Sequence, residues 1–281
     1  MFVLFVVISL INFTIIVNGN PVDRNESLGN FGGTRVVGGV DAPDGYAPHM
    51  VALVWGARVR NMMCGGSIIS VRHVLTAAHC IDPLVVNGKL IETTRGVVGT
   101  NQWNATEGVV KFSHFKNHPS WDAFRVKNDI GVLFLVEPLI LSARVDIVSL
   151  SYDWVDGDVS SFVTGWGRLG ADMSSTWILY PFADNLQLIN LKTLSPRDCA
   201  EALAASPGAG IRLESELEIC TFHSIGHGLC YGDSGSPLIE RATGAQVGLA
   251  SWALPCARGF PDVYARLSAY KNFLLDILQH Y

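Results

Sequence analysis

The sequence predicts an all-β protein that follows an apolar leader and ends in one helix. Short apolar runs alternate with turns made of Gly, Pro, Asn and Asp, for example at 51–55, 131–136, 162–164 and 246–252. This alternation is typical of β-barrels and β-sandwiches, and the pattern alone does not choose between them. The six cysteines favour a disulfide framework in a secreted protein.

The leader is the first 19 residues, a run rich in Phe, Val, Leu and Ile with no acidic or basic side chain. A transmembrane helix is one interpretation. The N-terminal position and the small residue Gly19 favour a secretory signal peptide that is cleaved after Gly19. No other apolar stretch is long enough to span a bilayer, so we expect a secreted protein without a membrane partner.

Residues 20–35 are polar and Gly-rich and end in Arg35. They have little to bury, so we interpret them as an activation propeptide. The segment has no cysteine, and cleavage after Arg35 therefore releases it.

Three short stretches carry the residue types of nucleophilic catalysis. They are Thr-Ala-Ala-His-Cys with His79, Asn-Asp-Ile-Gly-Val with Asp129, and Gly-Asp-Ser-Gly with Ser234. A serine needs an adjacent base to become a good nucleophile. That base needs an acid to fix its tautomer and stabilise its positive charge. Any one stretch alone is weak evidence, whereas all three in the order His, Asp, Ser point to one catalytic group.

Further motifs accompany these three, and they lie at 35–39 (Arg-Val-Val-Gly-Gly), 64–67 (Cys-Gly-Gly-Ser), 164–167 (Thr-Gly-Trp-Gly), 251–252 (Ser-Trp) and 261–264 (Pro-Asp-Val-Tyr). With them the chain resembles the trypsin/chymotrypsin-type serine proteases from Val36 to its C-terminus, and insect digestive chymotrypsins most of all. The resemblance implies a protease domain at 36–281 made of two six-stranded antiparallel β-barrels. Their boundary is expected near 145–160, with the active site in the cleft between them.

The resemblance also implies the role of each residue. Ser234 is the nucleophile, His79 the general base and Asp129 its orienting acid, while the N–H groups of Gly232 and Ser234 form the oxyanion hole. Cleavage after Arg35 frees an amine on Val36, which is expected to pair with Asp233 and order the site.

The specificity pocket is where the chain departs from trypsins. Gly228 stands where trypsins have Asp, and the walls align to Ala253 and Asp262. We expect cleavage after large apolar residues; a trypsin-like or an elastase-like preference is the alternative. Asp262 either admits Lys or Arg or is held by hydrogen bonds without a substrate role. The main chain of Ser251 and Trp252 is expected to pair with an extended substrate.

Other expectations complete the prediction. The implied disulfides are Cys64–Cys80, Cys199–Cys220 and Cys230–Cys256. Asn104 begins the glycosylation sequon that remains after activation. The apolar stretch from Trp177 to Phe182 either packs on its own barrel or contacts substrate or inhibitor. Ser236 stands where the family has Gly. We expect neither a metal nor another cofactor.

The last segment, Leu267 to Tyr281, has apolar residues at steps of three and four, at 267, 270, 273, 274, 277 and 278. That spacing predicts an amphipathic helix, which we expect to pack on the second barrel.

The expected partners are protein substrates, an activating trypsin-like protease and protein inhibitors, with the chain itself a monomer. The net charge of −5 and the lack of a basic run argue against nucleic acid. A catalytically dead homologue that acts by binding is the competing hypothesis, although such homologues typically lose a triad residue. An esterase elbow, Gly-x-Ser-x-Gly, does not fit.

Overall fold

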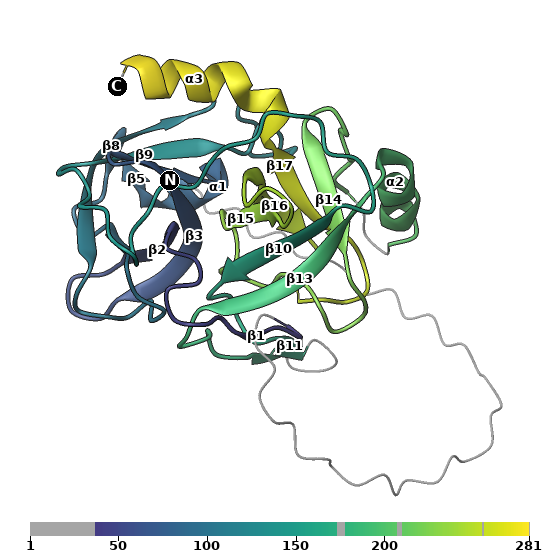
Figure 1. Ribbon diagram of the computed structural model, residues 1–281, viewed down its shortest axis with the longest axis horizontal. Coiled ribbons are helices and arrows are strands. Elements are labelled where there is room, and N and C mark those ends of the chain that lie inside the picture. The colour runs from purple at the N-terminus through teal and green to yellow at the C-terminus, as the bar shows by residue number, and fades with distance from the viewer. Residues whose placement is uncertain (1–36, 173–177, 207–209, 255, 281) are drawn as a thin grey trace, which may run out of the picture. The chain divides into compact units, whose positions relative to one another are not determined.

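Two sheets that each close on themselves form the β structure (Figure 1). The computed structural model describes residues 37–172, 178–206, 210–254 and 256–280. The leader, the propeptide and the Arg35–Val36 bond lie outside these residues. Within each barrel, closure pairs every one of the six strands on both sides.

The first barrel is antiparallel and has the strand order β2-β3-β4-β9-β8-β7, with β2 also paired to β7. Its interior is filled by apolar side chains, and β9 is buried at every position. The strands are β2 (Met50–Trp55), β3 (Asn61–Ser70), β4 (His73–Thr76), β7 (Arg95–Val97), β8 (Val109–Asn117) and β9 (Gly131–Leu135).

The second barrel has the order β13-β10-β15-β16-β17-β14 and closes through the pairing of β13 with β14. The prediction of two six-stranded antiparallel barrels is therefore confirmed. The strands are β10 (Ser160–Gly165), β13 (Gln187–Leu194), β14 (Glu218–Phe222), β15 (Pro237–Glu240), β16 (Gln246–Ala253) and β17 (Asp262–Arg266).

Short elements connect and extend the barrels. Strand β1 (Val40–Asp41) pairs with β13. Two small hairpins are made by β5 (Val85–Val86) with β6 (Lys89–Leu90) and by β11 (Ala171–Asp172) with β12 (Ile178–Leu179). The helical elements are α1 (Ala78–Ile81), the 3-10 turn η1 (Asp82–Leu84) and α2 (Pro196–Ala204). The side chain of Ser195 caps α2 by accepting a hydrogen bond from the Asp198 amide, which satisfies a free N–H group of the first turn.

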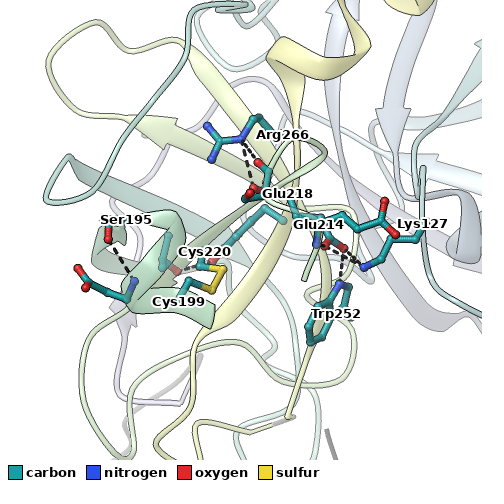
Figure 2. Close-up of a disulfide and its surroundings, with 12 residues drawn as sticks. Lys127, Ser195, Cys199, Glu214, Glu218, Cys220, Trp252 and Arg266 are labelled. Carbon is teal, nitrogen blue, oxygen red and sulfur yellow. Dashed lines mark hydrogen bonds and ion pairs between the residues drawn. A yellow bond between two sulfur atoms is a disulfide. The ribbon is translucent and has the colours of Figure 1, made fainter. Parts of the chain in front are cut away.

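The three disulfides implied by the resemblance are present: Cys64–Cys80, Cys199–Cys220 and Cys230–Cys256. Cys64–Cys80 ties α1 to β3. Cys199–Cys220 fastens α2 to β14 (Figure 2).

The C-terminal helix forms as predicted, but its packing was predicted wrongly. A 3-10 turn, η2 (Leu267–Tyr270), precedes α3 (Lys271–His280). The helix buries Leu274 and Ile277 in the larger apolar cluster, which holds the core of the first barrel and also includes some residues of the second. Its Phe273 ring lies 5.1 Å from the ring of His118, which follows β8 of the first barrel. Lys116 on β8 also pairs with Asp276 at 3.1 Å. The helix thus follows the second barrel in sequence and packs on the first. Among the described residues, no helix has the length and apolar character needed to cross a membrane.

Candidate active site

His79 and Asp129 are brought together by neighbouring strands of the first barrel. His79 lies on α1 just after β4, and Asp129 lies just before β9. Because Thr76 pairs with Gly131 across these strands, the two residues meet at the same end of the sheet. The Asp129 carboxylate accepts hydrogen bonds from His79 Nδ1 at 2.7 Å and from the His79 amide at 2.9 Å.

Ser251 adds a third hydrogen bond to this pair. Its hydroxyl donates to the same Asp129 oxygen at 2.6 Å, so a residue of β16 in the second barrel fixes an acid of the first. The sequence motif suggested only a main-chain role for Ser251. A lone serine beside a tryptophan gives no signal for a side-chain bond to a residue 122 positions away.

The geometry makes His79 a suitable base. Burial disfavours the charged imidazole, but the hydrogen bond and the charge of Asp129 outweigh it and raise the pKa of His79 above 6.5. Because Asp129 accepts from Nδ1, Nε2 is left to take a proton. A base of this kind functions near neutral pH.

Ser234 faces the same cavity as His79. The cavity has a volume of about 330 Å³ and is lined by His79, Leu229, Cys230, Tyr231, Ser234, Ala250, Ser251, Trp252 and Ala253. The Ser234 carbonyl accepts from the Gly65 amide at 2.8 Å, and the Gly235 amide donates to Ala250 at 2.7 Å. These bonds hold the serine between the two barrels.

The turn that leads into Ser234 has backbone N–H groups without a protein acceptor among the described residues. Among the described residues, neither the Gly232 nor the Ser234 amide donates to a protein acceptor. Gly232 has φ +100°, and a Cβ there would come within 2.7 Å of the Phe182 ring. Glycine is therefore required both by the backbone conformation and by the close approach. Two free amides in one turn can bind an oxygen that develops negative charge.

Asp233 points away from the cavity into the protein and is fully buried. Its two oxygens accept from the amides of Gly167 at 2.8 Å and Cys230 at 3.0 Å. Burial raises the pKa of Asp233 to about 6, although these two amides oppose the shift. A further cationic partner would favour the charged carboxylate.

The predicted pocket residues separate into two groups. Ala253 lines the cavity, whereas Gly228 and Asp262 lie behind Leu229 and are not among the lining residues. Asp262 accepts from the Leu229 amide at 2.9 Å, and one of its oxygens is 2.8 Å from where a Cβ of residue 228 would lie. The carboxylate thus occupies the space that a side chain at position 228 would fill. Burial raises the pKa of Asp262 to about 7.

Known proteins similar to this chain include serine proteases, in agreement with the arrangement of His79, Asp129 and Ser234. The family described as Trypsin matches residues 36–274. The chain belongs to the trypsin family. Chymotrypsin-2 of Vespa crabro is 32% identical over 240 residues, which cover 85% of this chain and 98% of that protein. Trypsin alpha of Drosophila melanogaster is 32% identical over 244 residues, which cover 86% of this chain and 87% of that protein. This trypsin-family chain is thus similar to proteins named for both specificities.

The structure of this trypsin-family chain describes only part of the predicted activation segment. Arg35 and Val36 lie outside the described residues. Val37 is described, and its carbonyl accepts from the Gly228 amide at 3.0 Å. The segment that follows the cleavage site therefore lies beside the loop that leads to Asp233.

The remaining predicted features are placed as follows. Trp177 is outside the described residues, and β12 follows it. Phe182 packs against Gly232 rather than standing free, with the Arg168 guanidinium 4.3 Å from the centre of its ring. Asn104 is exposed, as a glycosylated residue must be. Ser236 is fully buried, and its hydroxyl has no hydrogen-bond partner among the described residues.

Proposed function

We propose that the chain is a secreted serine endopeptidase that is made as a zymogen and hydrolyses peptide bonds through an acyl-enzyme. The observation that carries this proposal is the His79–Asp129 pair at 2.7 Å, which shares one cavity with Ser234. The chemistry agrees with the family to which the chain belongs.

In the proposed reaction, the Ser234 hydroxyl attacks the scissile carbonyl carbon while His79 Nε2 takes its proton. Asp129 stabilises the resulting imidazolium, and the Gly232 and Ser234 amides bind the oxyanion. His79 then gives the proton to the leaving amine, which departs and leaves the acyl group on Ser234. A water molecule, deprotonated by His79, then attacks the acyl carbon. The bond between that carbon and Ser234 Oγ breaks, His79 returns the proton to Oγ, and the acid is released.

Activation is proposed to begin with removal of residues 1–19 and then 20–35. Cleavage after Arg35 creates an amine on Val36, which we assign to Asp233. Two observations support this pairing: Asp233 is buried with only amide donors among the described residues, and Val37 lies beside Gly228. A buried carboxylate is stable when a cation pairs with it and costly when none does. The protease domain is then 36–281, with its two halves divided near 145–160.

For specificity we propose cleavage after large apolar residues, as in chymotrypsins. The walls of the cavity are mainly apolar, and Ala253 narrows it only slightly, which disfavours an elastase-like preference. Asp262 is proposed to give a second, weaker preference for Lys or Arg, because its carboxylate lies beside Gly228 and is bonded to Leu229, which lines the cavity. Ser251 and Trp252 bind the substrate main chain.

The biological setting follows from the same proposal. A cleaved leader places the protein outside the cell, and the resemblance to insect digestive chymotrypsins suggests the gut lumen. We propose a monomer that meets protein substrates, an activating trypsin-like protease and protein inhibitors, with a glycan on Asn104.

The test uses the purified full-length proenzyme. Treatment with trypsin is expected to produce an N-terminus at Val36 and activity on Phe and Leu peptides, with less on Arg and least on Ala peptides. A serine-directed inhibitor is expected to abolish it. The matched control is Ser234→Ala, which should be cut at Arg35 and stay inactive. A correctly cut wild-type chain without hydrolysis would instead favour a binding homologue.

A further inference from the structure

A buried ion pair joins the two barrels behind the wall of the cavity. Lys127 Nζ lies 2.7 and 2.8 Å from the two oxygens of Glu218. The side chains are only 5% and 4% exposed. Lys127 lies on the loop before β9, and Glu218 begins β14 (Figure 2). Removing two charges from water costs several kcal/mol for each ion, which the pair must offset by its geometry.

Each oxygen of the Glu218 carboxylate accepts a second hydrogen bond besides the one from Lys127. One oxygen accepts from the Trp252 indole N–H at 2.7 Å, and the other accepts from the Glu214 amide at 2.7 Å. Lys127 Nζ also lies 5.3 Å from the centre of the Trp252 ring. Figure 2 shows the indole and the ammonium group converging on this one carboxylate. Glu218 therefore fixes the Trp252 ring at its polar edge.

Both partners of the ion pair are connected to the candidate active site, Lys127 through the chain to Asp129 and Glu218 through its bond to Trp252. Lys127 is two residues before Asp129 in the sequence. Trp252 lines the cavity, and its neighbour Ser251 donates to Asp129. The ion pair and the Ser251 hydroxyl thus hold the same two segments together at two points. One point lies at the reacting groups, and the other lies farther along the strand.

A purely structural role is the simpler alternative. Apolar residues of similar volume often stabilise a fold as well as a buried ion pair does. They provide no acceptor for an indole N–H group, however, and Trp252 would lose the bond that sets its orientation. Orientation matters here because an extended peptide that binds as an added strand depends on main-chain alignment over several residues.

We infer that Lys127 and Glu218 are positioning residues for extended substrates: they set the Trp252 ring, and with it the strand 251–253 that aligns the residues preceding the cut. This inference rests on the proposed endopeptidase function. Its effect falls on the part of the substrate beyond the residue at the cut, since neither side chain lines the cavity.

The test compares two substrates with the same cut-site residue, a four-residue peptide amide and a single blocked amino-acid amide. In activated Glu218→Gln and Lys127→Met, kcat/KM for the four-residue substrate is expected to fall about ten-fold or more, mainly through KM, because a bond to a charged group is lost. The single-residue substrate should be unaffected. The matched control is Lys192→Met, which breaks an ion pair with Asp158 whose side chains are 61% and 82% exposed, and neither substrate should respond.

A double variant separates positioning from stability. Lys127→Met with Glu218→Leu is expected to recover the melting temperature that the single variants lose, yet to keep the defect with the four-residue substrate. Recovery of both properties together would overturn the inference, as would an equal loss on both substrates. If the single variants do not fold, the double variant still decides.

A binding measurement without hydrolysis separates a failure of this inference from a failure of the proposed function. In the Ser234→Ala background, calorimetry with the four-residue peptide should show a Kd about ten-fold weaker when Glu218→Gln is added. Equal Kd values, or no binding in either form, would overturn the inference. If the activated wild type hydrolyses nothing, the proposed function fails and this comparison still tests the positioning role.

Discussion

Asp129 and Asp262 are almost equally buried, at 2% and 4% exposure, but their surroundings differ. Asp129 receives hydrogen bonds from the His79 amide, His79 Nδ1 and the Ser251 hydroxyl. For Asp262 the Leu229 amide is the only donor among the described residues. Burial disfavours a charged carboxylate, and hydrogen bonds to the charged form oppose it. Asp262 therefore has fewer hydrogen bonds to offset its burial than Asp129 has, although the two side chains are almost equally buried.

The environment of Asp262 favours its neutral form. Burial raises its pKa to about 7, the Leu229 amide opposes the shift, and the nearby Asp233 adds to it. The carboxyl group thus changes its charge near neutral pH. In the proposed function Asp129 orients a base, whereas the charge of Asp262, close behind the cavity-lining Leu229, depends on pH.

The largest expected effect comes from replacing Asp129, the carboxylate with three hydrogen-bond donors. Asp129→Asn should lower kcat by about 10⁴-fold, because an amide favours the wrong tautomer of His79. Activity on a Phe peptide, normalised to correctly cut enzyme, measures the loss. In the wild type, the acid limb of kcat/KM should have its midpoint above 6.5, since neutral His79 is the active form and its pKa is raised. An Asp129→Asn variant within ten-fold of wild type would contradict this assignment.

Removing one of the three donors should cost less. Ser251→Ala deletes the hydroxyl that donates to Asp129, and kcat should fall about ten-fold, because a bond to a charged group is worth about 1.5–3 kcal/mol. The matched control is Ser113→Ala, whose hydroxyl bonds to His114 and Phe134 on the first barrel. Equal activity of the Ser251 variant and this control would show that two donors suffice.

Asp262, the carboxylate with one hydrogen-bond donor, should affect substrate specificity instead of the catalytic rate. Below about pH 7 Asp262 is protonated and neutral, and above it the charged form attracts Lys or Arg. The ratio of kcat/KM for Arg over Phe peptides should therefore rise up to about ten-fold from pH 6 to pH 8 in the wild type. It should be flat in Asp262→Asn. A flat ratio in the wild type would mean that Leu229 holds the carboxylate away from substrate.

The smallest effect concerns stability. The native state keeps the Asp262 proton up to about pH 7, whereas the ordinary pKa is 3.8. The free energy of unfolding therefore falls with rising pH across that window. Asp262→Asn removes this dependence, so its melting temperature relative to wild type should rise by a few degrees from pH 5 to pH 8, at about 2–4 °C for each kcal/mol. The exposed Asp158→Asn control should show no such trend.

Turn spacing in the sequence predicted an all-β protein, and the short motifs gave the order of the triad, because both are local signals. The two barrels were predicted only through the resemblance that those motifs carry. It did not predict the side-chain bond of Ser251 to Asp129 or the ion pair of Lys127 with Glu218. These residues lie 122 and 91 positions apart, and their pairing depends on how one barrel packs on the other. A Lys or a Glu in a loop is usually solvated, so nothing in the pattern marks this pair as buried.

The C-terminal helix shows the same limit in another form. Its apolar spacing predicts which face is buried, and Leu274 and Ile277 are indeed fully covered. The spacing carries no information about what covers them. Proximity in the chain suggested the second barrel, but the direction in which the chain leaves β17 takes the helix across to β8.

The glycines around Asp233 limit how the protein can be redesigned. A Cβ on Gly165 or Gly167 would overlap the oxygens of that carboxylate, and neither residue lines the cavity. In a randomised library, both codons should return only glycine among active clones, although neither position touches a substrate. Diversity is better placed at Ala253, which lines the cavity.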